Sequence, residues 1–353
     1  MHMNNEPLRE KHWIVGEVET SQGIIPRLAT RLDLLDRLGA IRVRLGVGRM
    51  SYTVNPGLYA VGSPMAESPV FVSANYKLSF DHLRSELEGI DGWIMVIDTK
   101  GVNVWCAAGK GTFGTAEIVH SIETTQLSKI VNHHTIIVPQ LGAPGVSAHK
   151  VKQDSSFRVI FGPVRAHDIP QFLADNMKAT PAMRRVLFTL GDRTVLIPME
   201  LVTGSPYVFG IAVALFFLAG LSKNGFAFPG WSSASNLLLL LVAYIGSCVL
   251  VPLLLPWLPG KAFSWKGALV GLVLAVLFIL IGVIPYSQLK GQLEAAGWVL
   301  LMPAIGAFMA MNFTGASTYT SLSGVKREMR YAVPLQIVTA ALGLILWVTA
   351  RFF

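Results

Sequence analysis

The residues of this chain best suited to chemistry lie in a short segment around one of its two cysteines. The segment reads Asn103-Val104-Trp105-Cys106-Ala107-Ala108-Gly109-Lys110. Asn103 is a favourable helix N-cap, so a short helix is expected to follow it and to end at the glycines beyond. Cys106 then lies in the first turn, where the partial positive charge of a helix N-terminus favours a thiolate. A thiolate there is a candidate metal ligand or nucleophile. The alternative is that Cys106 is a small buried hydrophobic residue, a common fate of free cysteines.

The glycine-rich continuation of this segment invites comparison with phosphate-binding loops. A Walker A loop needs a glycine five residues before Gly-Lys and a Ser or Thr directly after it, but Val104 and Gly111 occupy these positions. A dinucleotide fingerprint does match at Gly109, Gly111 and Gly114. It begins well after the predicted strand, however, and two histidines stand where an acidic ribose ligand is expected. Nucleotide binding is therefore the weaker interpretation.

The cysteine count limits the metal and redox chemistry. Cys248, the other cysteine, lies in an apolar run predicted to span a membrane, so no disulfide or iron–sulfur cluster is expected within the chain. There is no H-E-x-x-H motif, and the adjacent His133 and His134 would point to opposite faces of a strand, which disfavours a zinc site. Electrons for a redox step are expected to come from another protein.

Residues 1–190 are expected to form an α/β domain that positions this segment. Short β-rich runs alternate with helical patterns, which favours a mostly parallel, Rossmann-like sheet. Such folds bind ligands at the carboxyl ends of their strands. The loops after Asp98 and Val138 are therefore the expected binding loops, and the second contributes Gly142, Ala143 and Gly145. The Ser73–Tyr76 stretch after the first strand is a further candidate for contact with a ligand. The predicted strands are Val70–Ala74, Trp93–Asp98, His134–Val138 and Phe157–Phe161, and the predicted helices are Asp81–Leu87, Asn103–Ala108, Thr115–Thr125 and Asp168–Asn176.

Charge is distributed unevenly along the 353 residues. Residues 1–200 hold 21 Lys/Arg and 19 Asp/Glu, whereas residues 201–353 hold 8 and 2. Only 14% of the chain is charged, against about 25% in a typical soluble domain. This deficit excludes a disordered chain and argues against an ordinary cytosolic enzyme. Because the excess of positive charge comes mainly from the apolar half, it indicates membrane topology and not nucleic-acid binding.

The second half contains five apolar windows, each long enough to hold a membrane span of about 20 residues. Basic residues lie before the first window and after the second and fourth, which places the N-terminal domain in the cytoplasm by the positive-inside rule. The first thirty residues are mixed in charge, so no signal peptide is expected. The predicted spans carry no ionisable side chain, which favours an anchor over a transporter. A linker is predicted at residues 191–206, and the spans of a membrane domain at residues 207–353 lie near Tyr207–Leu221, Leu237–Leu258, Ala268–Tyr286, Trp298–Met311 and Tyr331–Ala350.

The cysteine segment resembles the cap-helix motif of the HgcA family, the membrane-anchored corrinoid proteins of microbial mercury methylation. The similarity extends through Gly111–Thr115, to the Pro139–Val146 loop, and to the order of a cytoplasmic domain followed by about five spans. The N-terminal half also resembles the corrinoid-binding domain of the corrinoid iron–sulfur protein large subunit of the acetyl-CoA pathway. That relative carries a cluster domain, which this chain lacks.

The resemblance implies an α/β corrinoid-binding domain followed by an all-α transmembrane domain, with Cys106 as the lower axial ligand of the corrinoid cobalt. It implies transfer of a cobalt-bound methyl group to Hg(II), forming methylmercury. A methyl-tetrahydrofolate-type system would supply the methyl group, and a ferredoxin-like protein with two [4Fe-4S] clusters would be the reductant. The residues expected to contact the corrinoid are Asn103, Val104, Trp105, Cys106, Ala107, Ala108, Gly109, Lys110, Gly142, Ala143 and Gly145.

The residues also allow two other functions. One is a membrane-anchored corrinoid methyl carrier whose acceptor is not mercury, because the sequence does not identify the acceptor. The other is a transporter with a cytosolic nucleotide-sensing domain. For Val104 and Trp105, ordinary core packing is an alternative to cofactor contact.

Overall fold

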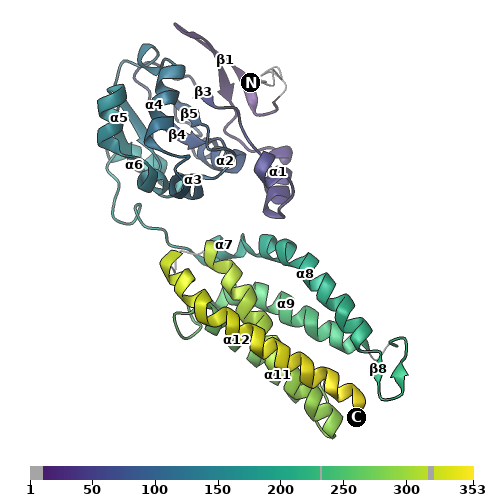
Figure 1. Cartoon of the computed structure of the whole chain (residues 1–353). Coiled ribbons are helices and arrows are strands. Elements are labelled where there is room, and N and C mark those ends of the chain that lie inside the picture. Colours follow the sequence, from purple (N-terminus) through teal and green to yellow (C-terminus); the bar gives the residue numbers. More distant parts are fainter. Residues whose placement is uncertain (1–10, 231–232, 317–321) are drawn as a thin grey trace. The chain divides into compact units, whose positions relative to one another are not determined.

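The computed structural model describes residues 11–230, 233–316 and 322–353. It divides into two compact units (Figure 1). The first unit comprises the chain up to Val43 together with Val47–Val186. The second comprises Leu187–Phe353 together with Arg44–Gly46.

The first unit is built on a seven-stranded sheet with the strand order β1-β2-β3-β5-β4-β6-β7. The pairs β2–β3, β4–β5, β4–β6 and β6–β7 are parallel, while β1–β2 and β3–β5 are antiparallel. The sheet is therefore mixed, and its parallel core carries the strands predicted from the sequence. The strands are β1 (Ile14–Thr20), β2 (Gly23–Leu28), β3 (Gly57–Val61), β4 (Val70–Ala74), β5 (Gly92–Ile97), β6 (Thr135–Val138) and β7 (Arg158–Phe161).

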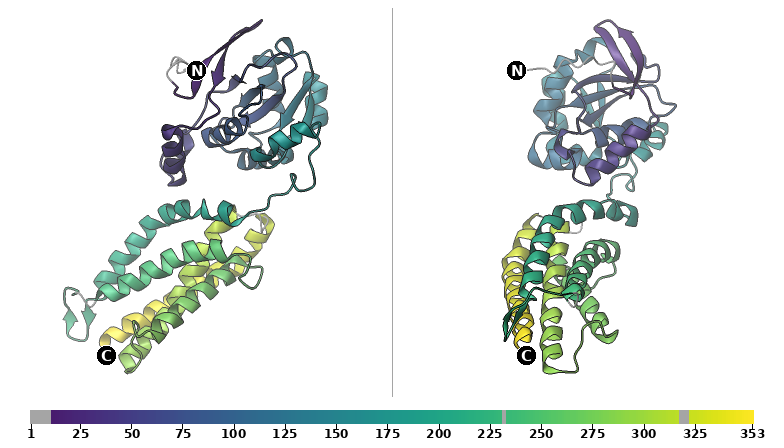
Figure 2. Two further views of the ribbon diagram at one scale, coloured as in Figure 1. Left: turned by 180° about the vertical axis from the view of Figure 1, so that it is seen from behind. Right: turned by 90° about the vertical axis from the view of Figure 1, so that its right-hand side faces the viewer.

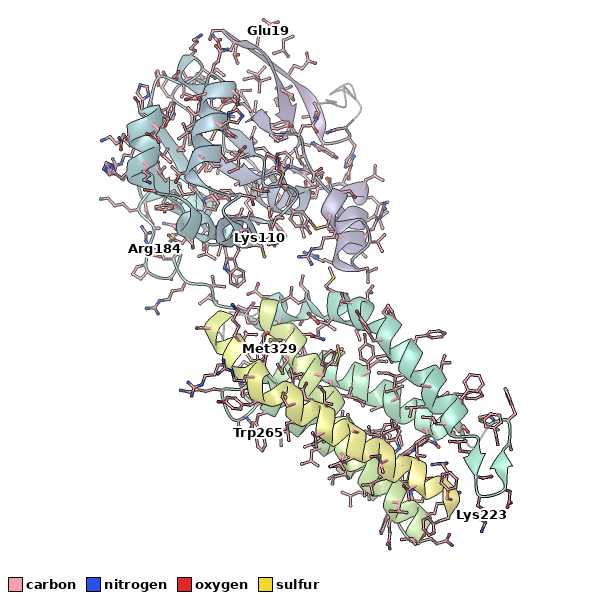
Figure 3. All side chains as sticks on the ribbon, in the orientation of Figure 1. Glu19, Lys110, Arg184, Lys223, Trp265 and Met329 are labelled. Atoms are coloured by element: carbon pink, nitrogen blue, oxygen red, sulfur yellow. The ribbon has the colours of Figure 1, made fainter. Side chains whose placement is uncertain are left out.

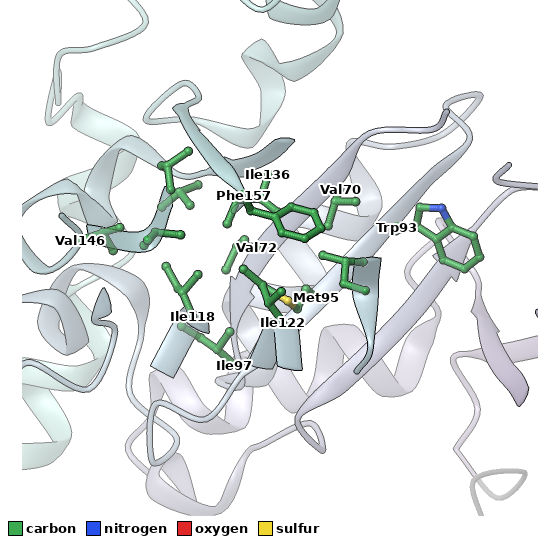
Figure 4. Packing of buried hydrophobic residues seen from close by; sticks show 14 of the residues in the cluster. Val70, Val72, Trp93, Met95, Ile97, Ile118, Ile122, Ile136, Val146 and Phe157 are labelled. Carbon is green, nitrogen blue, oxygen red and sulfur yellow. The ribbon is translucent and has the colours of Figure 1, made fainter. Parts of the chain in front are cut away.

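Helices cover both faces of this sheet because its central strands are apolar on both sides. On one face, Val72, Met95 and Ile136 pack against Ile118 and Ile122 of α4 (Figure 4). The same face also packs α3 and α5, whereas α2 and α6 lie on the opposite face. The helices are α2 (Lys77–Ser85), α3 (Val104–Lys110), α4 (Thr115–Thr124), α5 (Ala148–Ser155) and α6 (Ile169–Ala174).

A further helix, α1 (Leu34–Arg44), is fixed to the first unit by buried charges. The Asp36 carboxylate accepts hydrogen bonds from Lys77 Nζ and Arg84 Nη2, each at 2.6 Å, and both cations also bind Asp81. Burial alone would raise the pKa of Asp36, but the hydrogen bonds and charges of Lys77 and Arg84 outweigh it and hold that pKa well below its usual value. Asp36 is therefore ionised in the folded protein and joins α1 to α2.

We expect Asp36→Asn to lower the opening free energy of α1 by about 3 to 5 kcal/mol, because two buried cations are left with one carboxylate. Hydrogen exchange of the peptide containing α1, in the full-length chain, measures this change. The control is Asp33→Asn, because Asp33 caps α1 through the Asp36 amide and asparagine caps equally well.

The attachment of α1 to the first unit should persist in mild acid. Because the folded-state pKa of Asp36 is lowered, its stabilisation is fully present above the unfolded value of about 3.9 and is lost only as the pH falls through the lower folded value. If the amides of α1 in the wild-type chain lost their hydrogen-exchange protection between neutral pH and the unfolded pKa of about 3.9, this linkage would be contradicted.

Among its described residues, the second unit contains five helical stretches long and apolar enough to cross a membrane. This matches the predicted number of spans, and α8 to α12 lie side by side as a bundle (Figure 2). Glycines permit close packing: a Cβ on Gly271 of α10 would collide with the Met302 carbonyl of α11. The helices are α7 (Leu190–Thr194), α8 (Ile197–Leu218), α9 (Ala234–Leu254), α10 (Phe263–Leu280), α11 (Leu289–Asn312) and α12 (Leu322–Thr349).

Residues 191–206, where the sequence predicts a linker, are largely helical. Thr189 and Asp192 form a capping box that starts α7, and Pro198 lies in the first turn of α8, where its missing N–H costs nothing. α8 therefore begins ten residues before the predicted span and brings Glu200 into it. The candidate span Leu190–Leu218 thus carries Asp192, Arg193 and Glu200. Three of the other candidate spans also include charged side chains, such as Lys266 and Glu294, so the prediction of spans without ionisable side chains holds only for the shorter predicted segments.

Candidate functional site

The predicted cap helix is present as α3, at the carboxyl end of β5. Asn103 is extended at φ −64° and ψ 160°, and its Oδ1 accepts a hydrogen bond of 2.9 Å from the Cys106 amide. Gly111 ends the helix in the left-handed conformation, with φ 82°. The predicted N-cap is thereby confirmed, and the helix runs to Lys110, two residues further than expected.

The seven residues of α3 divide into two faces. Val104, Ala107 and Ala108 are buried and belong to the apolar core on the sheet. They hold the helix in place, so Val104 has a packing role, while its predicted contact with a cofactor stays a prediction. Cys106 is exposed, and the alternative of a buried hydrophobic cysteine is therefore wrong. The outward face is formed by Trp105, which is 41% exposed, with Cys106, Gly109 and Lys110, the last of which is labelled in Figure 3.

Gly109 leaves the outward face of α3 flat. A Cβ built on Gly109 meets no atom within 4 Å, and its φ is not left-handed. Glycine inside a helix costs roughly 1 kcal/mol relative to alanine, and no contact within the described residues requires it here. The residue is instead suited to a planar ligand that approaches the helix beside the Cys106 thiol.

The second predicted loop packs directly against this helix. It forms η4 (Gln140–Gly145), which follows β6. A Cβ on Gly142 would lie 2.5 Å from Cε1 of Phe113, and a Cβ on Gly145 would collide with the Phe113 carbonyl oxygen. Gly145 thus allows η4 to approach Ala108 of α3 closely, and Gly142 allows it to approach Phe113, while Ala143 between them is half-buried. The structure brings η4 and α3 together as expected, and gives Gly142 and Gly145 a packing role.

Asn75 lies in the Ser73–Tyr76 stretch, for which the sequence predicted a cofactor contact, and the structure gives it a positioning role that sequence reasoning missed. It follows β4, is 6% exposed, and its Oδ1 accepts hydrogen bonds from Thr99 N, Thr99 Oγ1 and Gly101 N at 3.1, 2.9 and 3.0 Å. Its Nδ2 donates to Asp98 Oδ1. Asn75 therefore ties the end of β4 to the loop that leads from β5 into α3. The signal in the sequence is an amide directly after a strand at the binding edge.

Asp98 completes this loop. Burial would raise its pKa, but hydrogen bonds from the Lys100 side chain and backbone, together with the Lys100 charge and a hydrogen bond from Asn75, hold the pKa below its usual value. Gly101, at φ 71°, allows the tight turn, because a Cβ there would lie 2.8 Å from the Met50 carbonyl oxygen. The loop that sets the direction of α3 is thus held by charge and hydrogen bonds.

We expect Asn75→Ala to destabilise the first unit by about 2 to 3 kcal/mol, because the buried amides of Thr99 and Gly101 lose their acceptor. Exchange protection of α3 should fall with it, since the preceding loop is released. Hydrogen exchange of the full-length chain measures both effects. Asn55→Ala, at an exposed position, is the matched control and should change neither; equal effects from the two variants would contradict this role for Asn75.

One group of potential metal ligands lies elsewhere in the described residues, at His12, Asp33 and Asp36. The Asp36 carboxylate in this group is already held by Lys77 and Arg84, so the cluster is accounted for by the attachment of α1. A surface hollow at the ends of α4 and α5, lined by Glu123, Lys129 and Asp154 among others, contains none of the predicted site residues. The outward face of α3 is therefore the best candidate site.

Comparison with known proteins points to one group of relatives. Residues 46–173 match the family model described as CO dehydrogenase/acetyl-CoA synthase delta subunit. The chain is also similar to the acetyl-CoA decarbonylase/synthase complex subunit gamma of Archaeoglobus fulgidus, with 31% identity over 130 residues, which is 36% of this chain and 27% of the relative. For the Methanopyrus kandleri subunit the identity is 32% over 122 residues, covering 34% and 26%. For Methanosarcina acetivorans it is 30% over 132 residues, covering 36% and 28%.

These similarities are limited in extent. The chain spans about a quarter of the length of the curated relatives that it matches. The family match lies within the α/β unit and includes α3 and η4. It contains none of the five helices suited to cross a membrane.

Proposed function

We propose that this chain is a membrane-anchored, corrinoid-dependent methyltransferase that passes a methyl group to Hg(II). The exposed Cys106 thiol beside the open face at Gly109 carries this proposal. Similarity to acetyl-CoA decarbonylase/synthase subunits supports the coarser role in corrinoid methyl transfer, because the related corrinoid iron–sulfur protein carries methyl groups. The cap-helix motif supports mercury as the acceptor.

The residues present fit a corrinoid in two respects. Cys106 offers a soft sulfur donor at the helix surface, fixed in direction by the hydrogen bond from its own amide to Asn103 Oδ1. Gly109, one turn further along, removes the side chain that would block a flat ring. Trp105 and Lys110 border the same face and would contact the periphery of the ring or its side chains.

In the proposed mechanism the Cys106 thiolate would hold the corrinoid through its cobalt, and its role would be to donate electron density to the metal. When bound, a corrinoid supplies a metal centre that can carry a methyl group and release it to an acceptor. A thiolate donates electron density more strongly than an imidazole, which favours release of the methyl group with its bonding electrons. Hg(II), a soft dication, accepts the methyl group in that form.

The rest of the chain sets the location and the partners in this proposal. The helices between Leu190 and Phe352 anchor the protein in the cytoplasmic membrane, with the corrinoid-binding domain in the cytoplasm. A methyl-tetrahydrofolate-type system supplies methyl groups. Because two cysteines cannot build an iron–sulfur cluster here, a ferredoxin-like protein with two [4Fe-4S] clusters supplies electrons.

Two measurements test this function. The purified full-length chain, incubated with a cobalamin, should acquire the visible absorption of a corrinoid; binding of a nucleotide instead would identify a nucleotide-sensing domain. Deletion of the gene should stop methylmercury formation by the cells, and complementation should restore it. Corrinoid binding together with undiminished methylation after deletion would identify a methyl carrier for another acceptor, the function that the similarity to acetyl-CoA decarbonylase/synthase subunits favours.

A further inference from the structure

The outward side of α1 is apolar, although the helix lies on the surface of the first unit. Leu34, Leu38 and Ile41 recur at the spacing i, i+4 and i+7, which places them on one face of the helix, and Leu45, directly after the helix end, continues the stripe. They are 69%, 52%, 54% and 38% exposed. In a surface helix of a soluble domain such a stripe normally packs against the core. In α1 it faces the solvent instead.

The helix cannot bury this stripe by rolling over, because its opposite face is fixed. Asp36 and Val43 are each 2% exposed, and Asp36 is tied to Lys77 and Arg84. The exposed leucines are therefore held outward by a buried ion-pair network. The orientation of the stripe is a property of the fold and not of a loosely attached segment.

Arginines flank the stripe on both sides. On a helical wheel, Arg37 lies on one side of the stripe and Arg42 on the other, and both are exposed. The turn that follows adds Arg49 and two more exposed apolar side chains, those of Val47 and Met50. Of the two acids in α1 and its cap, Asp36 is buried and paired with Lys77 and Arg84, and Asp33 lies at the helix start beside His12. Arg37 and Arg42 therefore make the two long sides of the stripe basic.

A convex apolar stripe with a basic rim matches the interface of a bilayer that contains anionic lipids. Helices that lie in this plane insert their apolar face between the headgroups and pair their cations with lipid phosphates. The candidate membrane helices of the same chain would keep the first unit close to such a surface, which raises the effective concentration for a weak contact.

We propose that Leu34–Met50 is a second, peripheral membrane-binding element, whose ligand is the anionic phospholipid surface. It holds the α/β unit by one defined side on the bilayer, in addition to the spans. Its position relative to β4 and β5 is set by the Asp36 network, so the contact orients the edge of the sheet from which α3 starts. This inference is independent of the cofactor and of the methyl acceptor.

The test uses the full-length chain in nanodiscs, with an environment-sensitive fluorophore at position 38. Leu38→Cys is labelled in a background of Cys106→Ser and Cys248→Ala, so that the attachment site is unique. In discs containing phosphatidylglycerol, the emission should shift to the blue, and brominated lipid should quench it by about half or more, as expected for a side chain below the headgroups. In discs of phosphatidylcholine alone, both effects should be much smaller. A label placed by Met65→Cys, at an exposed loop position, should respond to neither lipid.

Charge reversal tests whether the arginines of the rim bind the anionic lipid. Arg37→Glu with Arg42→Glu should abolish the quenching, while the matched pair Lys150→Glu with Lys152→Glu, on the exposed side of α5, should leave it unchanged. Hydrogen-exchange protection of β4 and β5, compared with the wild-type chain, is the control for folding of both variants. A blue shift without quenching by brominated lipid would show that protein covers the stripe and would overturn the proposal. An unshifted label in anionic discs would overturn it as well.

Discussion

Replacing Cys106 with alanine should abolish methyl transfer to Hg(II) while the chain remains folded and able to bind a corrinoid. The side chain is exposed, and its backbone N–H, not its sulfur, makes the capping hydrogen bond to Asn103. Its removal therefore costs the fold little. It removes the proposed axial ligand, and we expect activity to fall by about 100-fold or more, at least as much as loss of an outer-shell partner can cost a metal site.

The visible spectrum distinguishes cobalt ligation by this cysteine from a role in packing or substrate contact. Cys106→Ala loaded with corrinoid should show a shifted spectrum relative to wild type, because cobalt loses a sulfur donor. Cys106→Ser provides a near-isosteric comparison, with an oxygen in place of the soft sulfur. Cys248→Ala, which removes the buried cysteine of α9, is the matched control and should retain spectrum and activity. An unchanged spectrum in Cys106→Ala would remove Cys106 from the axial role.

Replacing Gly109 with leucine should prevent corrinoid binding without harming the fold. A Cβ built on Gly109 meets no atom of the folded chain within 4 Å, so the added side chain starts in open space. Leucine is also a better helix former than glycine by about 0.5 to 1 kcal/mol, so the stability of α3 should rise slightly. The side chain would, however, occupy the space beside the Cys106 thiol that a flat ring requires.

The measured quantity is the ratio of bound cobalt to protein after incubation with excess cobalamin. We expect Gly109→Leu to lose most of its bound corrinoid and Gly109→Ala, which adds a single methyl group, to lose less. Ala116→Leu, at an exposed position of α4, places the same bulk on the neighbouring helix and should bind normally. Full occupancy with an unaltered spectrum in Gly109→Leu would show that the cofactor does not lie over this face.

The site combines a strong local signal with support that comes from distant segments. Asn103, Cys106 and Gly111 fix the start, the thiol and the end of α3 within nine residues of sequence. The packing beneath α3 depends instead on the glycines of η4, which approach Ala108 and Phe113 closely. These glycines come from the loop after β6, about thirty residues further along the chain. Chemistry at Cys106 therefore needs both the local motif and the packing of β5 and β6 in one sheet.

The sequence alone determined the features of this protein that depend on neighbouring residues. The N-cap at Asn103, the strand Val70–Ala74 and the five apolar helices follow from hydrogen-bonding preference, β-rich composition and hydrophobic length, all of which act within one segment. The tertiary structure decided what depends on partners far apart in the chain. It paired β3 with β5, more than thirty residues further along the chain, in antiparallel fashion, so the sheet is mixed.

The same distinction applies inside the site. Whether Val104 or Trp105 faces outward depends on which side of α3 meets the sheet, and this is set by contacts with strands before and after it in the chain. The role of Asn75 depends on a loop more than twenty residues away. The outward stripe of α1 would be taken from its period as a core face, and only the burial of Asp36 against Lys77 and Arg84 turns it toward solvent. Periodicity specifies that a helix has two faces, but the burial free energy of the whole fold selects which face is covered.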